Sequence, residues 1–341
     1  MCYKPIHLLG FLLALPLLLH IPMTQSSGQT LKKDEITIGY SSPSGVFTPL
    51  YIAQEQSLFR KYGLGVKELL LLRGTGPAAA QMLVSGSAPI AALGGALVEA
   101  AIRGGELVYI ASMSNHLIFS LYSRPEIGRP EELKGKTVAV DAKGGSIELA
   151  TVVALKQFGL TLGKDVNAIY LGGPVAQLGV LEKRVVDAAT LSAPTTLKAK
   201  ALGLKELINI GALKLPYIHA AIGVNQAFAK SNPEMVEAFL KAYIEAIKIM
   251  QEEPETAKMA IAKYTGIKDS EALKATYETF LPAFRQRVPY VLPDSVQGVL
   301  NFSPSAEAKT HRAEEFIDHS FLEKIEASSF VKKLYGGELK P

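Results

Sequence analysis

Three stretches of small polar residues and glycine follow predicted strands and could bind an anion. They are residues 41–47, 73–76 and 143–146. Glycines let backbone N–H groups approach a ligand, and the amino end of a helix offers free N–H groups with a partial positive charge. The predicted ligand-binding residues are Ser41, Ser42, Phe47, Arg73, Gly74, Thr75, Gly94, Lys143, Gly144, Gly145, Ser146 and Ser192.

Each of these stretches could instead be an ordinary tight turn before a capped helix. Residues 74–79 also match the relaxed dinucleotide fingerprint G-x-G-x-x-A between a predicted strand and a helix. However, the next strand ends in Gly94-Gly95 rather than in the acid that would bind a ribose, and Glu99 falls inside the following helix. The sequence therefore disfavours a dinucleotide, and we expect no cofactor.

The residues that could catalyse a reaction are few. The single cysteine, Cys2, belongs to the N-terminal segment. No metal-ligand spacing and no G-x-S-x-G motif occur. We therefore expect a protein that is not an enzyme and that holds no metal. The histidines after residue 28 are His116, His219, His311 and His319.

The composition indicates a globular chain without a nucleic-acid partner. Of its 341 residues 48% are hydrophobic, and 36 Lys and Arg stand against 32 Asp and Glu. A disordered chain has fewer apolar residues, and a nucleic-acid-binding domain concentrates its basic residues. The length corresponds to about two domains, each with its own core.

Residues 1–28 are typical of a secretory signal peptide. Lys4 supplies a positive charge, an apolar run occupies residues 8–21, and small polar residues follow. The alternative is a membrane anchor, but the run is shorter than the roughly 20 residues that span a bilayer, and Pro16 interrupts it. We therefore expect this segment to be removed and the protein to be periplasmic.

Strands and helices alternate with short loops through the first two thirds of the chain. This pattern is typical of α/β folds with a largely parallel sheet. Residues 50–61 are predicted to form one helix, and the motif at residues 231–234 begins a helical C-terminal part. Predicted strands occupy residues 36–40, 66–72, 90–93, 107–112, 137–141, 168–171, 188–191, 207–210 and 218–224.

The alternating part of the chain repeats itself weakly. Residues 81–84 lead into the strand at 90–93, as residues 177–180 lead into the strand at 188–191. In both places a short helix precedes a strand that ends in a loop of small residues. The repeat predicts two similar lobes rather than one long sheet.

Residues 49–64 carry a specific resemblance. They read PLYIAQEQSLFRKYGL, which resembles the phrase P-L-Y-I-A-x-E-x-G-L-F-x-K-x-G-L of the periplasmic substrate-binding proteins of ABC importers, in the nitrate/sulfonate/taurine-type family. Residues 199–207 and Asn232-Pro233-Glu234 resemble later segments of that family. The chain departs from the family where it carries Ser57 and Arg184 in place of glycine, and Pro89 in place of aspartate.

The resemblance implies an α/β fold with two lobes, the periplasmic-binding-protein fold of type II-like form. Two crossover strands would join the lobes at about residues 117–123 and 217–224, and the C-terminal helices would form a return segment. The predicted lobes are residues 34–122 plus 223–341, and residues 123–222.

The implied function is the capture of a small anionic solute, organic or inorganic, outside the cytoplasmic membrane. The protein would act as a monomer and deliver the solute to an ABC permease, whose ATPase is a separate chain because no P-loop motif occurs here.

Two other functions fit the same fold. Relatives in pyrimidine and menaquinone biosynthesis are enzymes, but the thiamine-pyrimidine type relies on a cysteine-bearing segment that this chain lacks after Cys2. A periplasmic sensor would pass its ligand-bound state to a receptor instead of a permease. The sequence does not separate a sensor from a transport protein.

The signal peptide leads to a direct prediction. Because the apolar run is too short to anchor the chain, the exported protein should begin near residue 29. N-terminal sequencing of protein recovered from the periplasm checks this, and a sequence that starts at Met1 would contradict it.

Overall fold

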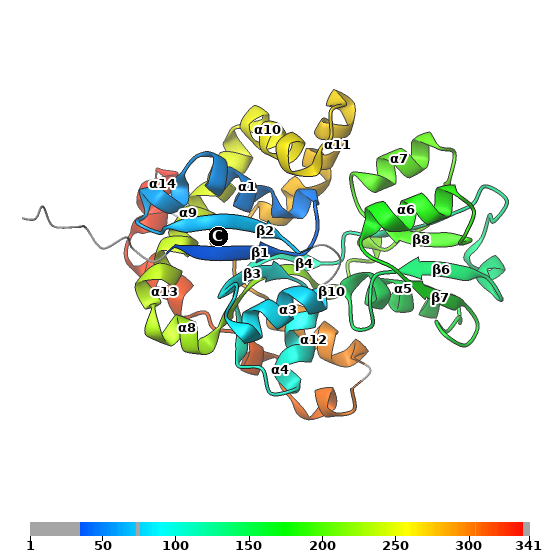
Figure 1. The fold of residues 1–341 in the computed structure, drawn as a ribbon, viewed down its shortest axis with the longest axis horizontal. Coiled ribbons are helices and arrows are strands. Elements are labelled where there is room, and N and C mark those ends of the chain that lie inside the picture. The colour runs from blue at the N-terminus through cyan, green and yellow to red at the C-terminus, as the bar shows by residue number, and fades with distance from the viewer. Residues whose placement is uncertain (1–34, 73–75, 304, 337–341) are drawn as a thin grey trace, which may run out of the picture. The chain divides into compact units, whose positions relative to one another are not determined.

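The computed structural model describes residues 35–72, 76–303 and 305–336. The predicted signal peptide, residues 1–28, lies outside them. Residues 34–341 form one compact unit, which contains two mixed sheets covered by helices (Figure 1). None of the helices in the described ranges combines the length and the apolar character needed to cross a bilayer.

The first sheet has the strand order β2-β1-β3-β10-β4. β1 pairs in parallel with β2 and with β3, whereas β10 runs antiparallel to both of its neighbours. The sheet is therefore mixed rather than largely parallel. Its strands are β1 (Ile36–Tyr40), β2 (Val66–Leu71), β3 (Ile90–Leu93), β4 (Leu107–His116) and β10 (Pro216–Asn225).

The second sheet follows the same plan, with the order β7-β6-β8-β5-β9. β6 pairs in parallel with β7 and β8, and β5 runs antiparallel to β8 and β9. The two similar lobes that the weak repeat predicted are thus present, as two sheets with matching strand orders. The strands are β5 (Ser120–Ser123), β6 (Thr137–Val140), β7 (Asn167–Tyr170), β8 (Ala188–Leu191) and β9 (Lys205–Asn209).

The chain passes between the two sheets twice, before β5 and before β10. β5 begins at Ser120 and already belongs to the second sheet, while β10 begins at Pro216 and belongs to the first. Each connecting strand pairs with its new sheet soon after the crossing, because its backbone groups need hydrogen-bond partners. The lobe boundaries at 122/123 and 222/223 remain predictions.

Helices cover both faces of each sheet (Figure 1). The helices are α1 (Thr48–Glu55), α2 (Leu58–Lys61), α3 (Gly76–Ser85), α4 (Ala96–Ile102), α5 (Ser146–Lys156), α6 (Pro174–Glu182), α7 (Thr195–Ala201), α8 (Gln226–Ser231), α9 (Pro233–Glu252), α10 (Pro254–Thr265), α11 (Ser270–Phe280), α12 (Pro293–Phe302), α13 (Ser320–Ala327) and α14 (Phe330–Tyr335). Short 3-10 helices are η1 (Gly45–Phe47), η2 (Pro130–Leu133), η3 (Gly211–Leu213), η4 (Leu281–Phe284), η5 (Glu307–Thr310) and η6 (Ala313–Phe316).

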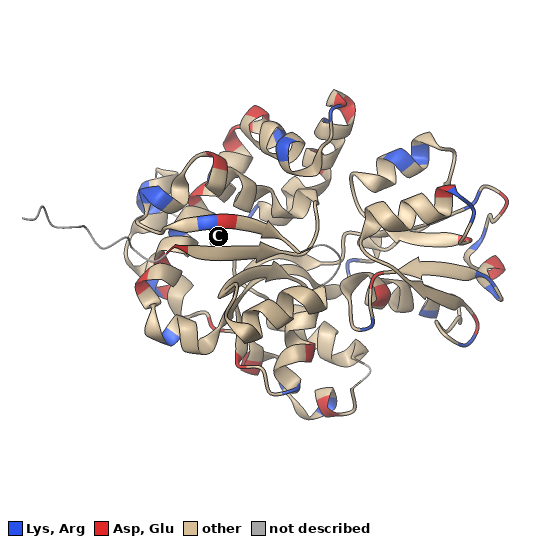
Figure 2. Cartoon of the chain, viewed as in Figure 1, with Lys and Arg blue, Asp and Glu red and all other residues tan. Residues whose placement is uncertain are grey.

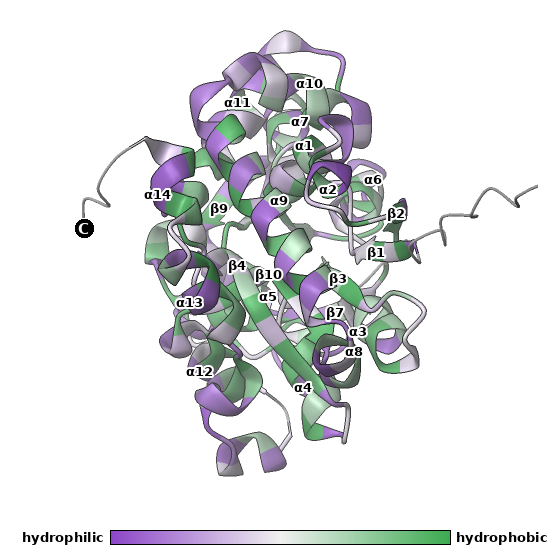
Figure 3. Ribbon diagram, turned by 90° about the vertical axis from the view of Figure 1, so that its left-hand side faces the viewer, coloured by the Kyte–Doolittle hydropathy of each residue, from purple (hydrophilic) through white to green (hydrophobic). Residues whose placement is uncertain are grey.

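The core divides along the faces of the sheets. One apolar cluster joins β1 to α1 and α9, a second joins β3 and β4 to α3, α4 and α12 and continues to α5, and a third lies under α6 and α7. Hydrophilic and hydrophobic residues are mixed along the covering helices (Figure 3), as expected of helices with one face on a core. Acidic and basic residues are interspersed over the covering elements of both sheets (Figure 2).

The two residues that stand where the family usually has glycine have a left-handed backbone. Ser57 has φ 54°, and Arg184 has φ 61°. An L side chain is strained in this region, which glycine adopts freely. Ser57 also divides the predicted helix at residues 50–61 into α1 and α2. The usual glycine at both positions is therefore explained by the turn rather than by a ligand.

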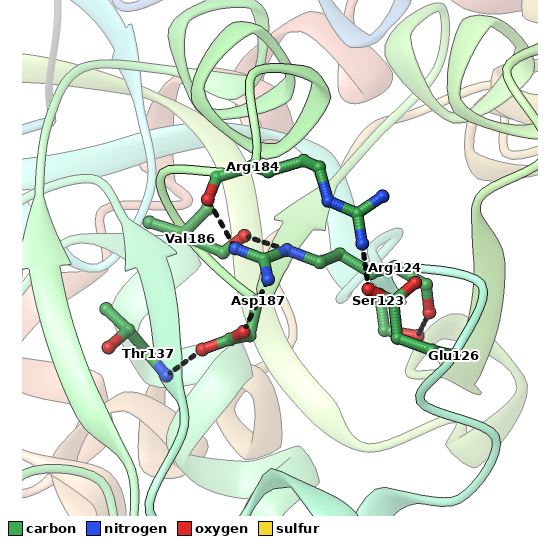
Figure 4. Close-up of polar contacts among 7 residues, drawn as sticks. All are labelled: Ser123, Arg124, Glu126, Thr137, Arg184, Val186 and Asp187. Carbon is green, nitrogen blue, oxygen red and sulfur yellow. Dashed lines mark hydrogen bonds and ion pairs between the residues drawn. The ribbon is translucent and has the colours of Figure 1, made fainter.

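A polar network joins three strands of the second sheet (Figure 4). The Arg124 guanidinium lies 3.2 Å from Asp187 Oδ1 and donates to the carbonyl oxygens of Val186 and Arg184. The other oxygen of Asp187 accepts the Thr137 N–H at 2.9 Å. The Asp187 carboxylate therefore connects three strands of the second sheet. Arg124 follows the end of β5, Thr137 begins β6, and Asp187 itself precedes the start of β8.

Relief of the strain at Ser57 should stabilise the protein. Ser57 is exposed and its side chain makes no described hydrogen bond, so Ser57→Gly should raise the free energy of unfolding by about 0.5–1 kcal/mol. The neighbouring Gln56 has φ −87°, and Gln56→Gly should lower it by about 0.5–1 kcal/mol. Urea denaturation of the two variants checks the prediction, which an equal loss of stability in both would contradict.

Candidate ligand-binding cleft

An inner cavity lies where the loops after β1, β6 and β8 come together. Ligands of open α/β sheets bind at this end of the strands. The cavity has a volume of about 40 Å³, which is room for only a few water molecules. Its lining residues are Ser41, Ser42, Ser44, Val46, Phe47, Gly76, Phe119, Asp141, Ser146, Ile147, Gly173, Pro174, Ser192, His219 and Ala220.

An outer cavity of about 550 Å³ adjoins the inner one. The two share six lining residues, among them Ser41, Gly173 and Ser192. The walls of the outer cavity are largely apolar, whereas the inner cavity is rich in hydroxyl groups. We call the two cavities together the cleft. The other residues of the outer cavity are Pro43, Leu71, Gly172, Val175, Ala176, Ala193, Pro194 and Thr195.

Several of the residues predicted to bind the ligand do line the inner cavity. They come from both sheets, and each lies in the loop or first helical turn after a strand, which is the signal that located them. That they touch a solute remains a prediction. These residues are Ser41, Ser42, Phe47, Ser146 and Ser192.

Gly94 lies beside the cleft but does not line it. A Cβ atom at Gly94 would lie 2.7 Å from the His219 carbonyl oxygen and 3.3 Å from the Ser146 Cβ. The Tyr109 hydroxyl donates to the Gly94 carbonyl oxygen at 2.7 Å. Gly94 therefore allows close packing of the chain on itself. The remaining predicted residues of the first sheet, Arg73, Gly74 and Thr75, lie outside the described residues.

The turn before α5 differs from its predicted role. The N–H of Gly144 donates to Glu148 Oε2 at 2.6 Å, and the N–H of Gly145 donates to a backbone carbonyl of the same turn at 2.9 Å. Lys143 is exposed and lines neither cavity. An anion could use the glycine N–H groups only by displacing these acceptors. Ser146 is the residue of the turn that reaches the inner cavity.

Asp141 occupies the amino end of α5 and was not among the predicted site residues. Its Oδ1 accepts the Glu148 N–H at 3.0 Å, and its Oδ2 accepts the Ile147 N–H at 3.4 Å. A Cβ atom at Gly145 would lie only 2.2 Å from Oδ2. Gly145 therefore makes room for a carboxylate of the chain itself. The position of Asp141 in the sequence could have indicated it. Asp141 is the last residue of a predicted strand, and Ser41 and Ser192, which were predicted to bind the ligand, come directly after predicted strands.

The Asp141 carboxylate is held in an unfavourable environment. Its side chain is 7% exposed, and no described Lys or Arg lies near enough to offset its charge. Burial raises the pKa of Asp141 to about 6, although the hydrogen bonds from backbone N–H groups oppose this rise. A proton therefore binds and leaves this group close to neutral pH.

His219 lines the inner cavity as a neutral imidazole. Burial lowers the pKa of His219 to about 3. Its Nδ1 accepts the Ile118 N–H at 3.2 Å, so the proton of the neutral ring is on Nε2. The ring packs on Phe119, with the centroids 4.4 Å apart. His116 borders a different cavity, which His219 does not line, so the two histidines do not line a common cavity.

No group of three or more His, Cys, Asp or Glu suited to a metal ion occurs in the part of the chain that the structure describes. The chemistry offered by the cleft is that of hydrogen bonding. Serine hydroxyls and the His219 ring can donate, and the Asp141 carboxylate can accept.

The sequence matches a family model described as NMT1/THI5 like over residues 44–257. A protein of Brachyspira hyodysenteriae, whose name describes an ABC transporter periplasmic binding protein, is 27% identical over 177 residues. That alignment spans 51% of this chain and 49% of the relative, so the chain spans about half the length of that curated protein.

Solved structures with the same fold are more distant in sequence. The alkanesulfonate-binding protein of Xanthomonas axonopodis pv. citri has a TM-score of 0.64 at 18% identity, over 79% of this chain and 89% of its own. The periplasmic nitrate-binding protein of Synechocystis has a TM-score of 0.68 at 15% identity, over 88% and 90%. The predicted two-lobed α/β fold is therefore confirmed.

The buried Asp141 should make the stability of the protein depend on pH. An unfolded aspartate has a pKa near 4, so between about pH 4 and pH 6 the folded protein binds more protons, and the free energy of unfolding falls as the pH rises. At neutral pH the ionised group costs on the order of 3 kcal/mol. Asp141→Asn removes this cost and keeps an oxygen for the Glu148 N–H.

We therefore expect Asp141→Asn to stabilise the solute-free protein at neutral pH, by about 1–3 kcal/mol, and to have little effect near pH 4. Urea denaturation at both pH values checks this. An equal destabilisation at both values would show that the carboxylate serves only to hold α5.

Proposed function

The chain belongs to the NMT1/THI5-like family, and on this premise we propose that it is an extracytoplasmic solute-binding protein of an ABC importer. The observation that supports the proposal most strongly is the cleft. Loops from both sheets line it with hydroxyl groups, a carboxylate and an imidazole, as in a binding site that surrounds a small molecule.

The two sheets supply opposite walls of the cleft. Ser41 and Ser42 follow β1 of the first sheet, while Ser146 and Ser192 belong to the second. A solute would bind to one wall first, and hinge closure at the two crossings would then bring the other wall onto it. The size of the inner cavity, about 40 Å³, means that a solute larger than a few atoms extends into the outer cavity.

Small anions are the first class of solute to test, because the structural neighbours are named for alkanesulfonate and nitrate. The serine hydroxyls of the cleft and the Nε2–H of His219 are hydrogen-bond donors that an acidic group of a solute could use. The outer cavity suits an apolar body, since Leu71, Val175 and Pro194 line it.

The proposed setting is the periplasm, with a permease and its ATPase as separate chains. The role is binding and release without chemical change, since the cleft presents no nucleophile with an adjacent base among the described residues. Transport to a permease is favoured over signalling to a receptor by the relative named for an ABC transporter.

A thermal-shift screen of the exported protein against sulfonates, nitrate, aromatic acids and pyrimidines, followed by calorimetry, tests the function. We expect one class of solute to bind in a one-to-one complex and to be recovered unchanged by mass spectrometry. A solute that is chemically converted by the purified protein, or the lack of any bound solute in a broad library, would contradict the proposal.

A matched pair of variants shows whether binding takes place in the cleft. Gly173 has an ordinary extended backbone and lines both cavities, so Gly173→Leu should fill the cleft and weaken binding by about tenfold or more. Gly179 lies in α6, the helix that follows Gly173, with nothing within 4 Å of its added Cβ and no place in the cleft. Gly179→Leu should bind as the unaltered protein does.

A further inference from the structure

Asp141 brings a formal negative charge into the inner cavity. Among the described lining residues of that cavity it is the one Asp, Glu, Lys or Arg. His219, the other titratable side chain of the lining, is neutral because its pKa is low. The described inner cavity therefore offers a solute a negative charge and no positive one.

Two other acids, Glu148 and Glu99, lie near the turn at Gly144 that follows Asp141. Glu148 accepts the N–H of Gly144 and the hydroxyl of Tyr170. Glu99 of α4 is 5% exposed, and one of its oxygens has no hydrogen-bond partner in the described structure. Its other oxygen lies 4.0 Å from the Arg103 guanidinium. A buried carboxylate oxygen without a partner is costly, and a positive group nearby would lower that cost.

Capping of α5 does not explain why residue 141 is charged. Serine and asparagine satisfy the N–H groups of a helix end about as well as aspartate does, without the cost of burying a charge. The carboxylate accepts backbone N–H groups, those of Glu148 and Ile147 at 3.0 and 3.4 Å among them, but it is paired with no described Lys or Arg. A buried charge that is kept without a charged partner in the chain suggests a partner from outside it.

We infer that Asp141 determines specificity by accepting a nitrogen donor of the solute, a protonated amine or amidine, in the inner cavity, while an apolar body occupies the outer cavity. This inference rests on the proposed function. It concerns one end of the solute, and an acidic group at the other end is compatible with it.

The dimensions of the cleft fit this arrangement. An ammonium group is about the size of a water molecule, and the inner cavity of about 40 Å³ holds a few such groups. The hydroxyl oxygens of Ser41 and Ser192 line the same cavity and can accept the remaining N–H groups. The apolar walls of the outer cavity, about 550 Å³ in volume, would cover an aliphatic chain or an aromatic ring.

Two pairs of probes that differ in one amine test the inference. The first pair is 4-(aminomethyl)benzenesulfonate and 4-methylbenzenesulfonate, and the second is benzylamine and benzyl alcohol. Calorimetry at neutral pH should show that the amine-bearing member of each pair binds at least about tenfold more tightly. In Asp141→Asn the preference should fall below about twofold, because the neutral amide repels one of the N–H donors.

Asp165→Asn is the matched control. Asp165 also accepts a backbone N–H, that of Thr161 at 2.9 Å, and lines no cavity described here, so this variant should keep the full preference. Three outcomes would overturn the inference: equal binding within both pairs, binding of neither amine, or a preference that persists in Asp141→Asn. A solute without a basic nitrogen that binds one-to-one in the cleft would also overturn it, while the proposed function would stand.

Discussion

The central constraint on this structure is the insertion of β10 between β3 and β4. This strand returns from the second sheet and hydrogen-bonds on both sides within the first, so it connects the sheets and completes one of them. Its neighbours must approach its backbone closely. A Cβ atom at Gly298 of α12 would lie 2.0 Å from the Pro216 carbonyl oxygen, and one at Gly94 would lie 2.7 Å from that of His219. One of the two crossings and the part of the cleft lined by His219 and Ala220 thus belong to one strand.

The cleft combines a small polar end with a larger apolar one. At the polar end a carboxylate and a neutral imidazole are both buried, and neither has a charged partner in the described structure. Such an arrangement lowers the stability of the empty protein, and it is a feature of binding sites rather than of cores. The apolar walls contribute buried contact area, but apolar contacts do not orient a solute. Its orientation therefore depends on the few polar groups at the inner end.

Much of the fold could be predicted from the sequence because it depends on local patterns. The strands at Ile90–Leu93 and Ala188–Leu191 were predicted with their observed bounds, since apolar runs between turn residues are clear signals. The antiparallel direction of β10 was not predicted, because strand direction depends on pairing across more than a hundred residues. The break at Ser57 was also missed, since nothing in its side chain indicates a left-handed backbone.

In the candidate site, Ser41, Ser146 and Ser192 were predicted from their position after strands. The packing of Gly145 against Asp141 was not predicted, because only the folded geometry of the turn after β6 brings the two into contact.

The matching orders of the two sheets have a consequence for how the chain is made. All strands of the second sheet lie between residues 120 and 209, whereas the first sheet draws on residues 36 to 225. In the first sheet β4 is the edge strand beside β10, so it joins that sheet only when β10 has been synthesised. During translation the N-terminal part of the chain therefore lacks β10, an interior strand of its sheet, and contacts across such distances form slowly. The first sheet therefore stays incomplete until residue 225 has been synthesised, a delay that suits the proposed export of an unfolded chain.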